Sequence, residues 1–223
     1  MPKAENGLKT LREAAYGRIV DLLNAQALQP GQVVTQRELV ERTGTSLAAV
    51  REAIPRLEAE GLMITLRQRG LMIPNVDVDF IRNAYQLRGI LEQEALANAP
   101  KNLPADTIET WERAHRGILE RLQQEPGEDL AGEAQAVDWA MHEALIASLG
   151  NALIAEVYRV NAIKVRMAAQ KRLLVTPFNA VRVMNEHLAV IEALRDGRGE
   201  DAAAAMRRHI GNSLQLALGG EVD

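Results

Sequence analysis

Four side chains in the second half of the sequence have the types and spacing of a divalent metal site. Asp138 and His142 are four residues apart, so they share one face of a predicted helix, and that face continues through the apolar Leu145. His187 and His209 stand in apolar stripes of two further predicted helices. Three imidazoles and one carboxylate suit Zn²⁺, Ni²⁺, Mn²⁺ or Fe²⁺, and Zn²⁺ is the ion we expect in the purified protein.

Other interpretations of these four residues stay open. Each histidine could be an independent core residue with its own partner, or the ion could be purely structural. A third alternative is a metal-dependent hydrolase or other metalloenzyme in which the Asp/His₃ site activates water. The sequence has no HExxH motif and no obvious further acid or base beside the ligands, which argues against that enzyme. His115 fits no ligand pattern, and we expect it to be structural or at the surface.

A series of helices must position these ligands. Apolar residues recur at helical spacing between glycine and proline separators, which predicts helices at 78–98, 105–124, 129–149, 151–172, 177–196 and 200–217. Six helices with short connections favour an all-α antiparallel bundle.

The first 75 residues have a different pattern. A helix is predicted at about 11–27, and Thr35 with Glu38 forms a capping box for a short second helix that Gly44 ends. Ser46 is the predicted N-cap of a third helix.

Two short apolar runs follow the third helix. They cover 62–65 and 71–73, and the predicted turn between them carries Arg67, Arg69 and Gly70. This order of elements specifies a winged helix-turn-helix, whose second helix fits a DNA major groove about 12 Å wide. The fold class is therefore mainly α, with a winged helix-turn-helix at 1–75 and an all-helical domain at 76–223.

Composition and charge limit the class of protein. Of the 223 residues, 47% are apolar and 25% charged, and there is no cysteine for a disulfide or a thiolate metal site. No stretch approaches the ~20 apolar residues of a membrane span and the N-terminus has no secretory signal, so we expect a cytoplasmic protein without a membrane partner. Residues 1–75 carry ten Lys and Arg against eight Asp and Glu, whereas residues 76–223 carry sixteen against twenty-two. This asymmetry is weak support for a DNA-facing N-terminal module.

Several separated blocks of the N-terminal region resemble the GntR family of transcriptional regulators. They are PGQVVTQREL at 30–39, GTS at 44–46, VREAI at 50–54, LEAEGL at 57–62 and RG at 69–70. The resemblance implies operator DNA as a partner and a wing at 67–70. It implies DNA contacts from Arg37, Ser46, Ala49, Arg51, Arg67, Arg69 and Gly70. The alternative for each arginine is a solvated surface charge.

Two features depart from that family. Its members usually have an arginine and small polar residues directly after the serine, where this chain has Leu47-Ala48-Ala49. A groove face of this kind can touch a thymine methyl group but cannot pair with guanine. Pro55 also lies inside the predicted recognition helix, where proline removes a backbone hydrogen bond.

The helical region resembles the FCD effector domain of one GntR subgroup, the FadR type. The matching blocks are Leu87-Arg88 with Leu91-Glu92, Asp138 to His142, Gly150-Asn151, Glu186-His187, and Met206 with His209. The resemblance implies that Asp138, His142, His187 and His209 bind the metal and that open positions receive a small organic acid.

Three further residues are candidates for binding that effector. The guanidinium of Arg88 could pair with its carboxylate, or could instead form an i,i+4 pair with Glu92. Tyr158 and Asn161 share the inward side of their helix and could bond effector oxygens, or could be buried polar anchors. We therefore expect a homodimeric, ligand-responsive DNA-binding regulator without catalytic activity.

Overall fold

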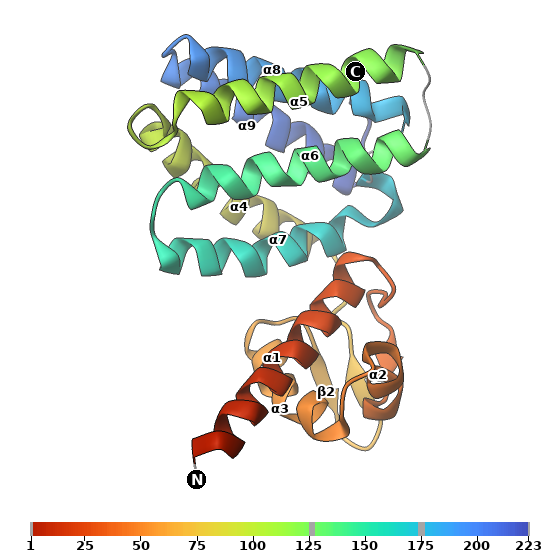
Figure 1. Ribbon diagram of the computed structural model, residues 1–223. Coiled ribbons are helices and arrows are strands. Elements are labelled where there is room, and N and C mark those ends of the chain that lie inside the picture. Colours follow the sequence, from red (N-terminus) through yellow and green to blue (C-terminus); the bar gives the residue numbers. More distant parts are fainter. Residues whose placement is uncertain (1, 125–127, 174–176, 223) are drawn as a thin grey trace. The chain divides into compact units, whose positions relative to one another are not determined.

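A computed structural model describes the backbone of residues 2–124, 128–173 and 177–222, and the side chains of 11–124, 129–168 and 179–222 (Figure 1). The chain forms two compact units. The first comprises Met1–Phe80 with Ile163–Ala168, and the second comprises Ile81–Ala162 with Ala169–Asp223. The predicted fold class is confirmed, because the described part is mainly helical with one small antiparallel sheet.

The first unit includes three helices, of which the second and third have the predicted caps. They are α1 (Pro2–Asn24), α2 (Gln36–Thr43) and α3 (Leu47–Ala59). The hydroxyl of Thr35 accepts the backbone N–H of Glu38 at 3.1 Å, and the Glu38 carboxylate accepts the N–H of Thr35 at 2.6 Å. Gly44 ends α2 at φ 62°, and the Ser46 hydroxyl accepts the N–H of Ala49 at 3.2 Å at the start of α3. These caps satisfy backbone donors that a helix end leaves without partners.

The wing is a three-stranded antiparallel sheet rather than a hairpin alone. Its strands β1 (Val33–Val34), β2 (Ile64–Leu66) and β3 (Gly70–Met72) lie in the order β1-β3-β2. Val34 and Thr65 both pair with Leu71, from opposite sides. The predicted hairpin is confirmed, and β1 is an addition that the sequence pattern did not indicate.

The core of the first unit collects the inward faces of α1 and α3 and the buried side of the sheet. A short segment of α7 that belongs to this unit also contributes to it. Among its members are Ile19, Leu23, Leu39, Val50, Ile54, Leu57, Leu71, Ile163 and Met167. Helix α3 continues through Pro55, which is exposed, so the residue does not interrupt the buried stripe.

The six predicted helices of the remaining chain are all present, with ends within four residues of those expected. They are α4 (Val78–Asn102), α5 (Ala105–Gln124), α6 (Glu128–Ala147), α7 (Ala152–Leu173), α8 (Pro177–Arg195) and α9 (Gly199–Ala217). Pro100 was expected to separate helices but lies in the last turn of α4. Figure 1 shows consecutive helices α5, α6 and α7 reversing direction. No helix among the described residues is long and apolar enough to cross a membrane.

Helix α8 lies at the centre of the second unit. It packs against α9, α5 and α6, and α5 packs against α6. An apolar cluster joins α5, α6 and α8 through Ile118, Leu122, Leu130, Ala134, Val183 and Met184. Residues one turn away on the same faces are polar and buried, and they form the site described next.

Candidate metal centre and nucleic-acid interface

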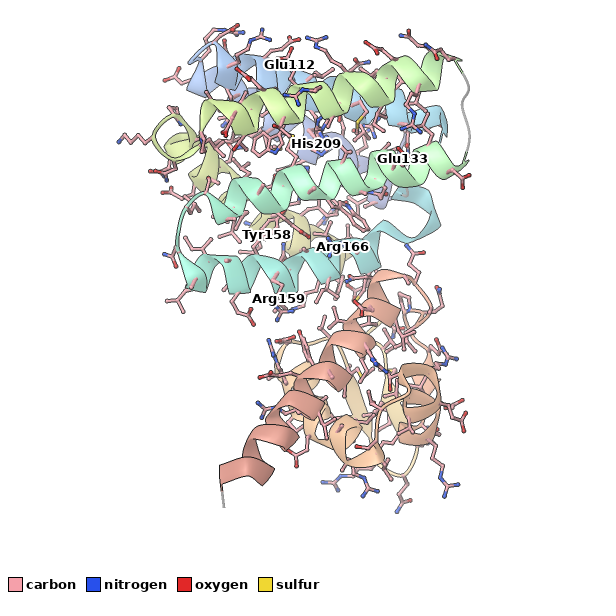
Figure 2. All side chains as sticks on the ribbon, in the orientation of Figure 1. Glu112, Glu133, Tyr158, Arg159, Arg166 and His209 are labelled. Carbon is pink, nitrogen blue, oxygen red and sulfur yellow. The ribbon has the colours of Figure 1, made fainter. Side chains whose placement is uncertain are left out.

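Four buried side chains from three helices meet inside the second unit. Asp138 and His142 come from α6, His187 from α8 and His209 from α9. One ligand atom from each lies within 4.8 Å of the others. Figure 2 shows His209 among the helices of the bundle rather than at its outer surface. The four residues singled out in the sequence as metal ligands are therefore brought together.

The spacing of the ligand atoms fits a single divalent ion. Asp138 Oδ1 lies 3.2 Å from His187 Nε2, 3.6 Å from His142 Nε2 and 4.0 Å from His209 Nε2. The Nε2 atoms of His187 and His209 are 3.3 Å apart. Ligand atoms about 2.1 Å from one ion stand about 3 to 4 Å from each other. Small movements of the side chains would therefore bring all four atoms to one ion.

The other ring nitrogen of each ligand histidine is held by a polar neighbour. His142 Nδ1 lies 2.8 Å from a carboxylate oxygen of Glu92, and His209 Nδ1 lies 2.8 Å from a carboxylate oxygen of Glu186. A carboxylate only accepts, so these two Nδ1 atoms carry the hydrogens and the Nε2 lone pairs face the cluster. Metal-binding histidines are commonly oriented by partners of this kind.

His115 is the polar neighbour of the third ligand. Its Nε2 lies 3.0 Å from His187 Nδ1, and its own Nδ1 lies 2.6 Å from the carbonyl oxygen of Trp111. Its side chain is completely buried. Sequence reasoning missed this role, although Trp111, His115, Ile118 and Leu122 form one stripe on α5 that marks His115 as buried.

The electrostatics of the cluster keep three of its four groups ready to bind a cation. Burial alone would raise the pKa of Asp138, but the adjacent imidazoles of His142 and His187 hold it well below its ordinary value. Burial lowers the pKa of His187, and burial with the neighbouring His187 lowers the pKa of His209 to about 3. The carboxylate is therefore charged and these two imidazoles are neutral at neutral pH.

Arg88 lies against the same cluster. Its Nε donates to Glu92 at 2.8 Å, which is the i,i+4 pair given above as the alternative to effector binding, and its Nη2 lies 2.6 Å from His142 Nε2. Burial alone would lower the pKa of Arg88, but Glu92 raises it, so the guanidinium is charged. Because arginine has only donors, Nε2 of His142 accepts this hydrogen bond.

The other two predicted effector ligands are also buried. The Tyr158 hydroxyl donates to Glu92 at 2.8 Å and so lies beside the cluster (Figure 2), and the amide nitrogen of Asn161 donates to the carbonyl oxygen of Ala84 at 2.9 Å. Both residues are anchored to α4, which agrees with the anchor alternative and leaves the effector role a prediction. Each helix from α4 to α9 thus supplies at least one side chain in or beside the cluster.

The arginines predicted to contact DNA are all exposed on the first unit. Arg37 lies on α2, Arg51 on α3, and Arg67 and Arg69 at the turn between β2 and β3. Arg51 Nε donates to Gln36 Oε1 at 2.9 Å, which links the helix expected in the groove to the preceding helix.

The small residues predicted at this surface differ in their placement. Ser46 is exposed and caps α3, and Gly70 is half-buried at the start of β3. Ala49 is only 2% exposed and packs in the core of the first unit, so its side chain cannot reach a base edge. This placement corrects the expectation for Ala49. Leu47 and Ala48 are the exposed residues of the same turn.

Two parts of the chain match known protein families. Residues 11–73 match the gntR family of bacterial regulatory proteins, and residues 83–212 match the FCD domain. The first match covers the helix-turn-helix and wing, and the second covers the helices that carry the four candidate metal ligands.

Relatives and solved structures agree with these matches. The Nta operon transcriptional regulator of Aminobacter aminovorans is 27% identical over 183 residues, which make up 82% of this chain and 82% of that protein. The HTH-type transcriptional regulator BphR of Paraburkholderia xenovorans is 28% identical over 218 residues, covering 94% of this chain and 86% of that protein. The solved structure of E. coli McbR/YncC has a TM-score of 0.76 at 17% identity and covers 94% of this chain and 97% of that chain, which shows a shared fold.

Proposed function

Because this chain belongs to the GntR family of bacterial regulatory proteins and carries an FCD domain, we propose that its operator binding responds to a small carboxylate held at a divalent metal ion. The chain is a DNA-binding transcriptional regulator and not an enzyme, as its families and relatives are regulators, so the metalloenzyme alternative is not favoured. The observation that carries the proposal is the convergence of four ligand atoms within 4.8 Å of one another.

Charge supports an anionic effector. Asp138 and Glu92 contribute two buried negative charges, Arg88 contributes one positive charge, and the three ligand histidines would be neutral when they bind an ion. A divalent ion would leave this buried group with excess positive charge, which a carboxylate would offset. The ion would supply open coordination positions for effector oxygens. Arg88 would donate two parallel hydrogen bonds to the effector carboxylate, and Tyr158 and Asn161 would contact other oxygens of the effector.

The first unit supports DNA binding through the N-terminus of α3. This helix has no acidic residue in its first turn, so the positive end of its dipole is not offset there. We assign operator contacts to Arg37, Ser46, Arg51, Arg67, Arg69 and Gly70. We assign DNA binding to residues 1–75 and effector sensing to residues 76–223. A homodimer would read two half-sites related by its own two-fold symmetry.

Binding to a duplex from upstream of the chain's own coding region tests the proposal. Fluorescence anisotropy with Zn²⁺ and a panel of hydroxy and keto acids should show operator affinity changing by about 5- to 150-fold with the right acid. If Arg51 contacts a base, the Arg51→Ala variant should lose about 1–3 kcal/mol of discrimination between bases. If Arg51 contacts a phosphate, the slope of log affinity against log salt should become shallower by about 0.9. Arg113→Ala, an exposed arginine on α5, is the matched control and should bind like the wild type.

Two results would contradict parts of this proposal. Binding that is neither salt-sensitive nor sequence-selective under any effector condition would remove the operator-binding assignment. Selective operator binding that no acid or metal alters would leave the regulator intact and make the ion purely structural.

A further inference from the structure

His115 is a completely buried histidine that is not one of the four ligands. It lies on α5, which supplies no metal ligand, and contacts the cluster through His187. Its ring contacts that of His187 edge to face, with centroids 5.2 Å apart. A buried imidazole with both nitrogens engaged has a fixed orientation, so its hydrogens can be placed.

The direction of each hydrogen bond follows from the carbonyl oxygen of Trp111. That oxygen only accepts, so Nδ1 of His115 carries a hydrogen. The ring is completely buried, and its two nitrogens face a carbonyl oxygen and another imidazole rather than a carboxylate that would stabilise a charged form, so the ring is neutral and its Nε2 is an acceptor. His187 Nδ1 must then donate to it, and the remaining lone pair of His187 lies on Nε2.

The opposite tautomer of His187 has a ready partner. Its Nε2 lies 3.2 Å from Asp138 Oδ1, so a hydrogen on Nε2 could bond that carboxylate. In that tautomer, Nε2 of His187 would carry a hydrogen in place of its lone pair, and the hydrogen bond would also engage one oxygen of Asp138. His115 opposes this arrangement by offering an acceptor to Nδ1.

We propose that His115 is a positioning residue that fixes the Nδ1–H tautomer of His187 and keeps the Nε2 lone pair of His187 available to the metal ion. Glu92 and Glu186 do the same for His142 and His209 with carboxylates. His115 does it without adding a charge to a cluster that already buries Asp138 and Glu92. The inference rests on the proposed metal site.

Three variants separate this role from packing. His115→Phe keeps a ring but offers no acceptor to His187. His115→Gln places an amide oxygen near the position of Nε2 and should rescue the bond. Trp111→Phe alters packing on the same turn of α5 but keeps the backbone carbonyl that orients His115, so it is the matched control.

Zn²⁺ affinity should be measured on the full chain by competition with a chromogenic chelator, with thermal unfolding as a check on folding. His115→Phe should bind Zn²⁺ about 10- to 100-fold more weakly, the usual cost of removing such a partner, while His115→Gln and Trp111→Phe stay within about threefold of the wild type. In metal-free protein, ¹⁵N NMR of the imidazoles should show His187 protonated on Nδ1 in the wild type and on Nε2 in His115→Phe.

The two readouts distinguish failure of the inference from failure of the metal site. Wild-type affinity and an unchanged His187 tautomer in His115→Phe would overturn the positioning role. An equal loss of affinity in all three variants would also overturn it, because packing alone would then account for the effect. A wild-type chain that binds no Zn²⁺ would overturn the metal site itself, while the NMR comparison would still decide the tautomer.

Discussion

Arg88 and a metal ion would compete for one lone pair. The guanidinium donates to His142 Nε2, and the same nitrogen is one of the four atoms that converge on the cluster. A cation at the cluster must displace this hydrogen bond, after which Arg88 keeps its bond to Glu92 and has free donors for a carboxylate. Metal binding would therefore prepare Arg88 for the effector.

The Arg88→Gln variant should change metal and effector affinity in opposite directions. A hydrogen bond to a charged group contributes about 1.5 kcal/mol at the lower end of its range, so Zn²⁺ should bind about tenfold more tightly without Arg88. Carboxylate binding should weaken by at least about tenfold for the same reason. Calorimetry with Zn²⁺, and then with the acid, measures both affinities.

Glu92 limits how this variant can be studied. It would lose its charged partner while buried, which can cost about 3–5 kcal/mol of folding stability. Measurements below the unfolding transition, with Gln86→Ala on the exposed side of α4 as the control, keep the comparison valid. Loss of Zn²⁺ affinity in folded Arg88→Gln would show that Arg88 supports the metal rather than competing with it.

The sequence was informative about single residues where periodicity decides which way a side chain faces. Asp138, His142, His187 and His209 each lie in an apolar stripe, and they meet as expected. Ala49 was assigned from the order of matching blocks, which does not specify a face, and it is buried. His115 was missed because its role depends on a partner 72 residues away, which no local pattern encodes.

Among the elements, α3 begins at a residue with two separable roles. Ser46 caps the helix through its hydroxyl and is also exposed at the end expected to face DNA. Ser46→Ala should lower the free energy of unfolding by about 1 kcal/mol because the cap is lost. Ser46→Asp should keep that stability, since aspartate caps equally well, yet weaken DNA binding by placing a negative charge near phosphates.

Chemical denaturation and operator titration of the two variants provide the measurement. Equal operator affinity for Ser46→Asp and the wild type would mean that this end of α3 does not approach the phosphates. A stability loss in Ser46→Asp as large as in Ser46→Ala would mean that the hydroxyl does not act as the cap.

The wing depends on a glycine that no other residue can replace without strain. Gly70 has φ 111°, and a Cβ added there would lie 2.6 Å from the backbone oxygen of Val34. Gly70→Ala should destabilise the first unit by about 1–3 kcal/mol from backbone strain alone, and more from this clash. Gly117→Ala on α5 is the control, where an added Cβ meets nothing within 4 Å and should stabilise the chain by about 0.5–1 kcal/mol.

Thermal unfolding of the two alanine variants should therefore shift in opposite directions. An unchanged transition in Gly70→Ala would mean that β1 and β3 can separate at little cost. Operator affinity should also fall in Gly70→Ala, because Arg67 and Arg69 lie at the turn that precedes this strand.

Secondary structure was predictable where the pattern is long. The six helices after residue 77 span many turns, and each was expected within a few residues of its ends. β1 has two residues, too few for an alternating pattern to appear. Pro100 was taken as a separator, but a proline near a helix end disturbs few hydrogen bonds, and α4 continues to Asn102.

At the scale of the whole molecule, metal binding should stabilise only the second unit directly. An ion at a thousand times its dissociation constant adds about 4.1 kcal/mol of folding free energy, or roughly 8–16 °C in the unfolding temperature of a domain of this size. Both tryptophans, Trp111 and Trp139, belong to the second unit, so their fluorescence reports its unfolding in the full chain.

Removing the metal with a chelator should lower the unfolding temperature of the wild type. The same treatment should not change the unfolding temperature of a His209→Ala variant, because that variant lacks one ligand. Adding Zn²⁺ back should restore the wild-type transition. A chelator effect of equal size in wild type and variant would place the stabilising ion elsewhere in the chain.

The order of the cluster residues along the chain matters during protein synthesis. Translation delivers Arg88 and Glu92 early, and His209 arrives only with α9, after four intervening helices. A nascent polypeptide on the ribosome therefore cannot hold the ion with all four ligands until α9 has emerged and packed against α8. Tight binding of the ion would then be a property of the complete chain. An incomplete chain would bind the ion more weakly and release it.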